Sequence, residues 1–159
     1  MKINIISVGN IKEKYLKDAI NEYSKRLSKY TKIEFLSTFD EPISTNPSAR
    51  DEEIVKNKEG ERLLKIIPEN SYKIVLDLKG EMLSSPELAN KFIDIFNYNN
   101  STISFIIGGS LGLSDAVLKS ADYHLCFSKM TFPHQLMQVI LLEQIYRAFK
   151  INNNETYHK

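Results

Sequence analysis

The stretch 103–134 constrains the fold most, because it holds two short apolar runs that each end in a loop. The first run, ISFII at 103–107, is β-branched and aromatic and stops at two adjacent glycines. A buried strand that breaks into a loop has this pattern. Beyond the loop GGSLG, Ser114 and Asp115 offer N-cap side chains for a helix over 116–121. The sequence therefore predicts a strand, a glycine loop and a helix in succession.

The second apolar run, YHLCF at 123–127, reads as another buried strand and leads into the loop 128–132. Pro133 follows that loop and suits the first turn of a helix. Because two strand ends lie so close in sequence, we expect their loops to line one pocket.

The remaining chain alternates apolar runs with amphipathic ones. We predict strands over 2–8, 33–38 and 72–78, a turn at 79–81, and helices over 12–29, 48–67 and 86–96. The first of these helices should bury an inner stripe of Tyr15, Leu16, Ala19, Tyr23 and Leu27. This order predicts an α/β fold with a mostly parallel sheet and helices on both faces. Ligands of such sheets bind at the carboxyl ends of the strands.

Length and composition favour one domain spanning 1–159. The chain has 159 residues, of which 42% are hydrophobic and 26% charged, which suits one compact core. The apolar run from Ile3 to Val8 is too short for a membrane span or a signal peptide, so we expect a cytoplasmic protein that does not enter a membrane. Cys126 is the single cysteine and is expected to be a buried hydrophobe.

The net charge of +1 hides an uneven distribution. Residues 1–32 hold eight lysines and arginines against three acids, whereas 33–70 hold five against nine. The basic side chains of the first helix region are Lys12, Lys14, Lys17, Lys25, Arg26 and Lys29. They could meet phosphates, or they could simply form a solvated helix face.

The last predicted helix, 133–150, is apolar around nearly its whole circumference. One sheet face should not bury all of it, so we expect a homodimer. Glu143 and Arg147 are spaced for an i,i+4 ion pair on its narrow polar side. The polar tail 151–159 is expected to fray.

Several chemistries are disfavoured by spacing. The glycine loop lacks the patterns of dinucleotide and phosphate-binding loops, and no serine lies in a hydrolase elbow. The three histidines, His124, His134 and His158, have no metal-ligand spacing, so no metal is expected. A pocket walled by backbone and apolar side chains suits a reaction whose leaving group comes with a cofactor. Two alternatives stay open: a nucleotide-binding hydrolase or oxidoreductase that uses GGSLG, and a non-catalytic ribosome-binding module.

Three motifs resemble one known family. The runs FIIGGSLGLS and SKMTFPHQLMQVILLEQIYRAF and the ending TYHK are similar to the ribosomal RNA large subunit methyltransferase H family, which belongs to the SPOUT methyltransferases. The likeness extends from INIISVGNIK in the first strand to the last residue. One departure is Gln138, where many members are expected to have arginine.

The resemblance implies S-adenosylmethionine-dependent methylation of N3 of a pseudouridine in large-subunit (23S) rRNA, by a homodimer with a C-terminal trefoil knot. The small net charge leaves little surface for gripping free RNA, so we expect the assembled ribosome to be the substrate. The implied catalytic residues are Arg147, Tyr157 and His158. The implied cofactor-binding residues are Leu76, Gly108, Phe127, Ser128, Lys129, Met130, Thr131 and Phe132.

Overall fold

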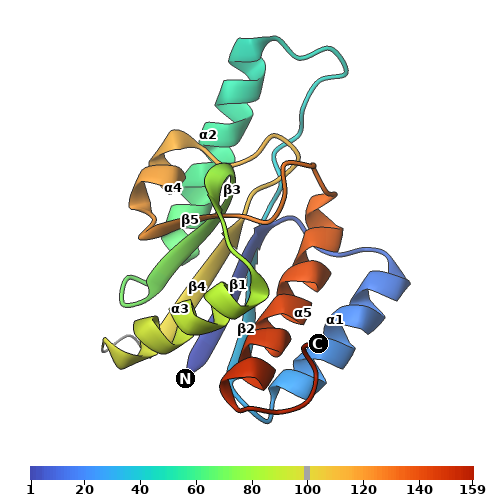
Figure 1. Cartoon of the computed structure of the whole chain (residues 1–159). Coiled ribbons are helices and arrows are strands. Elements are labelled where there is room, and N and C mark those ends of the chain that lie inside the picture. The colour runs from blue at the N-terminus through green and yellow to red at the C-terminus, as the bar shows by residue number, and fades with distance from the viewer. Residues whose placement is uncertain (99–100) are drawn as a thin grey trace.

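The computed structural model describes residues 1–98 and 101–159, which alternate strands and helices (Figure 1). The strands are β1 (Lys2–Val8), β2 (Lys32–Thr38), β3 (Tyr72–Met82), β4 (Thr102–Ile107) and β5 (Tyr123–Cys126). The helices are α1 (Lys14–Leu27), α2 (Ala49–Ile66), α3 (Ser85–Asn97), α4 (Asp115–Ser120) and α5 (His134–Asn152). Each predicted strand and helix is present, with bounds that differ by a few residues except in β3.

The five strands form one sheet in the order β2-β1-β4-β3-β5, and every neighbouring pair is parallel. All five strands therefore end at the same edge, where the connecting loops gather (Figure 1). The predicted parallel sheet is confirmed.

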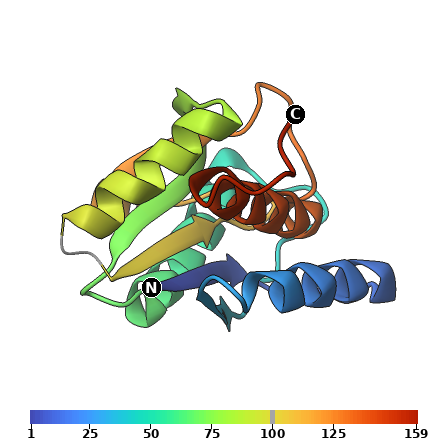
Figure 2. The same cartoon turned by 60° about the horizontal axis from the view of Figure 1, so that its bottom comes forward.

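Helices cover both faces of the sheet, as predicted (Figure 2). Successive side chains of a strand point to opposite faces, so Ile5 enters one core and Ile6 the other. The larger core joins the sheet to α1, α3 and α5, with Phe92 and Leu141 at its centre. The smaller core joins the other face to α2 and α4.

The predicted inner stripe of α1 is partly wrong. Leu16 and Leu27 are buried, but Tyr15 is 70% exposed, and Ile20 takes the inner position instead. The aliphatic side chain fits against the sheet, whereas the phenol of Tyr15 stays in water.

Strand β3 is longer than predicted, and the turn expected at 79–81 is not a chain reversal. Leu76 pairs with Leu125, and Glu81 pairs with the same residue, so 77–80 form a bulge beside β5. Gly80 lies against the β5 backbone there, since a Cβ atom on it would come within 2.6 Å of the His124 carbonyl oxygen. The bulge turns Asp77 and Leu78 toward the sheet edge.

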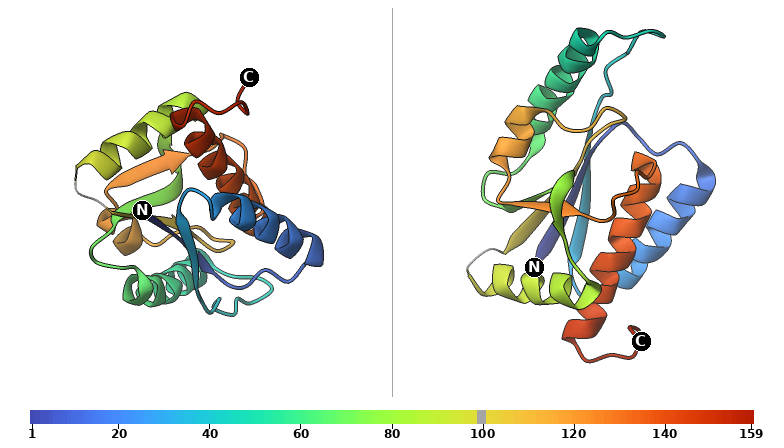
Figure 3. Two further views of the ribbon diagram at one scale, coloured as in Figure 1. Left: turned by 90° about the horizontal axis from the view of Figure 1, so that it is seen from below. Right: turned by 45° about the horizontal axis from the view of Figure 1, so that its top comes forward.

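Helix α5 buries most of its surface inside its own chain, because it packs between α1 and α3 against the sheet (Figures 2 and 3). Leu141, Leu142 and Ile145 are 0% exposed. The apolar circumference of α5 is therefore covered largely within one chain and does not by itself require a dimer.

The C-terminal tail is held in place, contrary to the prediction that it frays. Asn154 adopts a left-handed conformation with φ 53°, which reverses the chain after α5. The Glu155 carboxylate then accepts hydrogen bonds from the Tyr30 hydroxyl at 2.8 Å and from Lys150. Those two hydrogen bonds lower the pKa of Glu155 to about 2. The tail is thereby fastened against α1 and α5.

Within residues 1–98 and 101–159, no helix combines the length and the hydropathy that crossing a membrane would need. No group of three or more histidine, cysteine or acidic side chains in the same residues is placed to hold a metal ion.

Candidate active site

A cavity of about 710 Å³ opens at the carboxyl ends of β3, β4 and β5. Its walls come from the bulge of β3, the glycine loop, the loop after β5 and the first turn of α5. The two loops predicted to line one pocket do so.

The cavity contains most of the predicted cofactor-binding residues. Those that line it are Leu76, Gly108, Phe127, Ser128, Met130, Thr131 and Phe132. Lys129 is exposed and is not part of the lining. The lining also includes residues that the sequence reasoning did not single out, among them Asp77, Leu78, Pro133, His134 and Met137. What these residues bind stays a prediction.

The glycine loop owes its shape to close contact within itself. A Cβ atom on Gly108 would lie 2.7 Å from the carbonyl carbon of Gly112 and 3.0 Å from the nitrogen of Leu113. Gly112 has φ 87°, a conformation that favours glycine, and pairs with Gly109 in an isolated bridge. The absence of a side chain at Gly108 therefore lets the loop close on itself.

The loop after β5 is held by two short-range hydrogen bonds. The Cys126 thiol donates to the Ser128 carbonyl oxygen at 3.1 Å, and the Ser128 hydroxyl accepts from the Met130 backbone N–H at 3.0 Å. Cys126 is 4% exposed, as its predicted role as a buried hydrophobe requires. Together these contacts present backbone groups and the rings of Phe127 and Phe132 to the cavity.

Asp77 is the only carboxylate lining the cavity in the described parts of the chain. Its side chain is 18% exposed; it contacts His124 Nδ1 at 2.9 Å and accepts from the Lys79 backbone N–H at 3.0 Å. Burial raises the pKa of Asp77, but the hydrogen bonds from His124 and Lys79 outweigh it, so the net pKa is lowered. A negative charge therefore faces an otherwise apolar cavity at neutral pH. An acidic residue inside the predicted strand 72–78 was the signal that the sequence offered, but the direction of its side chain depends on the bulge in β3.

The predicted catalytic residues form a second cluster, at the other end of α5. Arg147 donates from Nη2 and Nε to Glu143 Oε1 at 2.7 and 3.1 Å, and Tyr157 donates to the same oxygen at 3.2 Å. Arg147 also lies over the Tyr157 ring, 4.7 Å from its centroid. Its Nη1 is 3.3 Å from His158 Nδ1. The structure thus brings Arg147, Tyr157 and His158 together within one chain.

The electrostatics of this second cluster fix the protonation state of Tyr157. Burial and the neighbouring Glu143 raise the pKa of Tyr157, so its phenol is a hydrogen-bond donor near neutral pH. Arginine carries only donors, so His158 Nδ1 is the acceptor in its contact with Arg147.

The two groups of residues are far apart in one chain. Met137, in the cavity wall, and Arg147 are separated by about 15 Å along α5, at 1.5 Å per residue. Figure 1 shows the C terminus folded back beside the lower part of α5, away from the loops at the carboxyl edge. The cavity wall and the Arg147 cluster therefore lie toward opposite ends of α5 in one chain.

Comparison with known proteins adds the family. Residues 1–158 match the family model described as "Predicted SPOUT methyltransferase". A protein of Clostridium botulinum (strain Alaska E43 / Type E3) named "Ribosomal RNA large subunit methyltransferase H" is 62% identical over 160 residues, covering 100% of both chains. Proteins of the same name from Alkaliphilus oremlandii and Clostridium acetobutylicum are 60% and 56% identical, again over 100% of each chain.

Solved structures share the fold at low identity. A probable methylase family protein from Haemophilus influenzae superposes with a TM-score of 0.55 and 18% identity, over 99% of this chain and 70% of that one. A putative methyltransferase from Legionella pneumophila, solved with bound SAM, gives a TM-score of 0.51 and 9% identity, over 94% of this chain and 66% of that one.

Proposed function

We propose that this chain, which belongs to the SPOUT methyltransferase family, transfers a methyl group from S-adenosylmethionine to N3 of a pseudouridine in 23S rRNA. The observation that carries the proposal is the cavity built by the glycine loop and the 127–132 loop, in a chain 62% identical over its whole length to a named large-subunit rRNA methyltransferase. We propose that the reaction takes place in the cytoplasm, on the assembled ribosome. We also propose that residues 1–159 form one domain.

The direct test is methyl transfer in a defined mixture. Purified protein, ribosomes from a strain lacking the gene and isotopically labelled S-adenosylmethionine should yield one labelled pseudouridine, located by mass spectrometry of rRNA fragments. Calorimetry with S-adenosylmethionine, NAD and ATP separates the alternatives. Binding of NAD or ATP alone would favour a hydrolase or oxidoreductase, and binding of none would favour a ribosome-binding module.

The cavity fits S-adenosylmethionine in size and charge. Its volume of about 710 Å³ lies within the range of small-molecule sites. The bound donor supplies an activated methyl group on a sulfonium, whose sulfur leaves as a neutral thioether. Apolar walls and backbone groups from Gly108 and the 127–132 loop suit the adenosine, and Asp77 suits a cationic group of the donor.

Asp77→Asn is expected to weaken S-adenosylmethionine binding about tenfold, because an ionised carboxylate facing a cation in a partly buried site is replaced by a neutral amide. Calorimetry with S-adenosylhomocysteine shows which cation is recognised. An equal loss for both ligands indicates the shared ammonium, and a loss for S-adenosylmethionine alone indicates the sulfonium. Glu81→Gln is the matched control, since Glu81 is also on β3 but binds the Tyr123 hydroxyl outside the cavity. Unchanged affinity in Asp77→Asn would remove Asp77 from the site.

Arg147, Tyr157 and His158 are proposed to act on the base. Attack by N3 requires loss of the imide proton and places negative charge on the flanking carbonyl oxygens. The guanidinium of Arg147 can stabilise that charge, and the Tyr157 hydroxyl can donate a further hydrogen bond. The proton passes to His158 Nδ1 if substrate binding draws Arg147 away from it, and otherwise to water.

We propose that the active site is shared between two protomers. Support comes from the separation of about 15 Å along α5 between the cavity wall and Arg147 of the same chain. In a symmetric dimer, the cavity of one protomer can face the Arg147 cluster of its partner, and twofold symmetry then makes two equal sites.

We also propose the trefoil knot that the family resemblance implies. β5 is the edge strand, yet α5 packs over the middle of the sheet between α1 and α3. The segment 127–133 must therefore carry the chain back across the carboxyl edge, past the β3 bulge that also lines the cavity.

The basic N-terminal region is proposed to contact rRNA phosphates. Lys14 and Arg26 already pair with acids of their own helix, and Lys29 lies 3.5 Å from Glu155. Lys12 and Lys25 are exposed and form no ion pair within the described residues. They are the better candidates for binding RNA.

Replacing Lys12 and Lys25 together by alanine should weaken ribosome binding at moderate salt and leave S-adenosylmethionine affinity unchanged. Each lost phosphate contact should reduce the slope of log affinity against log salt by about 1. The control is Lys65→Ala with Lys119→Ala, two exposed lysines on α2 and α4. Equal salt slopes for the two double variants would contradict an RNA contact at this surface.

A further inference from the structure

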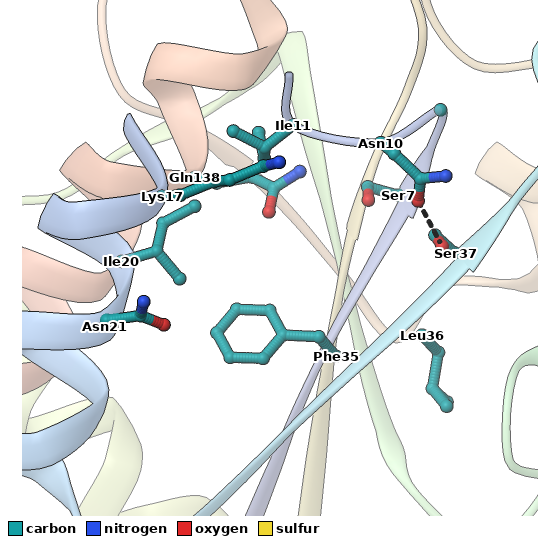
Figure 4. A pocket seen from close by; sticks show the side chains of 11 residues that line it. Ser7, Asn10, Ile11, Lys17, Ile20, Asn21, Phe35, Leu36, Ser37 and Gln138 are labelled. Atoms are coloured by element: carbon teal, nitrogen blue, oxygen red, sulfur yellow. Dashed lines mark hydrogen bonds between the residues drawn. The ribbon is translucent and has the colours of Figure 1, made fainter. Parts of the chain in front are cut away.

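A second cavity of about 260 Å³ lies at the carboxyl ends of β1 and β2 (Figure 4). The two are neighbours through both the sheet and α5. Ser7 of the second cavity pairs with Ile107 of the first, and Gln138 of the second follows Met137 of the first. A molecule that spans this edge of the sheet would meet both.

The side chain of Gln138 is the unexplained group in this second cavity. Gln138 is 5% exposed, and its amide points into the cavity from α5 (Figure 4). No hydrogen bond from this amide to another side chain or to the backbone is present within the described part of the chain, and its atoms are open to the cavity rather than sealed in the core. An amide offers both a donor and an acceptor. A ligand with a complementary donor and acceptor would satisfy it.

The opposite wall is an exposed aromatic ring with amides around it. Phe35 of β2 is 44% exposed and points into the same space, facing Asn21 of α1 (Figure 4). Asn10 accepts a hydrogen bond from Ser37 at 3.0 Å, which leaves its NH₂ group for another partner. Lys17 adds a cation to the lining. This lining suits a nucleotide, because the flat ring can stack on a base, the amide groups can form hydrogen bonds with the edge of the base, and the cation can contact a phosphate.

We propose that this second cavity binds an unpaired nucleobase of the RNA substrate, close in sequence to the base that is methylated. Phe35 stacks on the base, the Gln138 amide reads its edge, and Lys17 contacts its phosphate. The volume of about 260 Å³ accommodates a single base rather than a whole cofactor. The inference rests on the proposed function, because it assumes that RNA is the substrate, and it adds a recognition site distinct from the methyl-donor cavity.

The first test needs no methyl transfer. Isotopically labelled protein saturated with S-adenosylmethionine is titrated with the four ribonucleoside 5′-monophosphates while side-chain amide resonances are recorded. The expected result is that at least one nucleotide shifts the Gln138 and Asn21 amides at millimolar concentration, and that Gln138→Leu abolishes the shift of Asn21. No shift with any of the four nucleotides would overturn the proposal.

The second test uses methylation kinetics on ribosomes. Phe35→Leu removes the aromatic ring, and Gln138→Leu removes the amide at a similar side-chain size. Each should raise KM for the ribosome about tenfold, in line with losing one stacked or bidentate base contact. The kcat and the S-adenosylmethionine affinity should not change. Phe39→Leu, an 81% exposed phenylalanine outside this cavity, is the control.

The outcomes separate this inference from the proposed function. Wild-type KM in both variants overturns the inference and leaves the methyltransferase intact. A change in the dimer dissociation constant without a change in KM also overturns it, because the cavity would then belong to the contact between protomers. If the wild type methylates nothing, the proposed function fails, and the nucleotide titration still decides whether the cavity binds a base.

Discussion

Gly108→Val is expected to lose measurable S-adenosylmethionine binding while the protein stays folded. The Cβ atom of any side chain at 108 would lie 2.7 Å from the Gly112 carbonyl carbon and 2.9 Å from its oxygen, so the glycine loop must open. That loop forms one wall of the cavity. Overpacking of this kind costs about 1–3 kcal/mol of stability, which thermal unfolding would record beside the calorimetric loss of binding.

Gly109→Ala is the matched control for that experiment. Its Cβ atom would meet the end of a side chain, Glu59 Oε1 at 3.1 Å, instead of backbone, so the neighbour needs to move by only a few tenths of an ångström. We expect near-normal folding and an affinity within a few-fold of the wild type. A folded Gly108→Val protein that binds S-adenosylmethionine normally would show that the donor does not occupy this cavity.

Deletion of residues 157–159 is expected to abolish methylation and to spare folding, dimerisation and cofactor binding. The deletion removes Tyr157 and His158 from Arg147 but leaves the cavity at the other end of α5 untouched. The tail remains fastened up to Glu155 by Tyr30 and Lys150, so the loss should not spread into the core. Methylation of ribosomes, calorimetry and sedimentation measure the three properties separately.

Arg147→Ala should lower kcat by about 10²–10³ with unchanged S-adenosylmethionine affinity, the size expected when one donor to a developing oxyanion is removed. Arg147→Ala also leaves Glu143 without its ion-pair partner. Arg147→Lys controls for this effect, because lysine keeps the charge without the bidentate geometry.

Full methylation activity after deletion of residues 157–159 would show that the tail takes no part in the mechanism.

The parallel sheet was predictable because its strands are short β-branched runs that end at glycines or turn residues. The path of β3 beyond Leu78 was not, since the polar residues 79–81 look like a turn and their strand pairing depends on contact with β5. The tail was also missed. Its order depends on Glu155 meeting Tyr30, a residue 125 positions earlier in the chain.

Some features of the candidate site were likewise predictable from the sequence, and others were not. Loops that follow parallel strands of one sheet lie at the same edge, so a cavity shared by the loops after β4 and β5 was predictable, although β3 stands between these two strands. The position of Asp77 in the cavity wall did not follow from the sequence, because only the bulge in β3 turns this residue toward that edge. The separation of Arg147 from the cavity could have been estimated from the length of α5. The contact between Arg147 and His158 required the reversal at Asn154.

The contact between Arg147 and His158 within one chain also decides how a shared active site must be tested. Because Arg147 and the tail belong to one cluster in one chain, pairing an Arg147→Ala chain with a truncated chain damages both clusters and should stay inactive. A chain with a damaged cavity must instead be paired with a chain that has a damaged cluster. Gly108→Val and the deletion of 157–159 are such a pair.

The measurement is methylation by mixed dimers of those two inactive chains, coexpressed in equal amounts. If each site takes its cavity from one protomer and its Arg147 cluster from the other, a mixed dimer has one intact site, and random pairing should restore about a quarter of wild-type activity. Purifying the mixed dimer through two different tags should raise the recovery to about half. No recovery in mixed dimers of confirmed composition would contradict the shared site, and place both halves of the chemistry in a single chain.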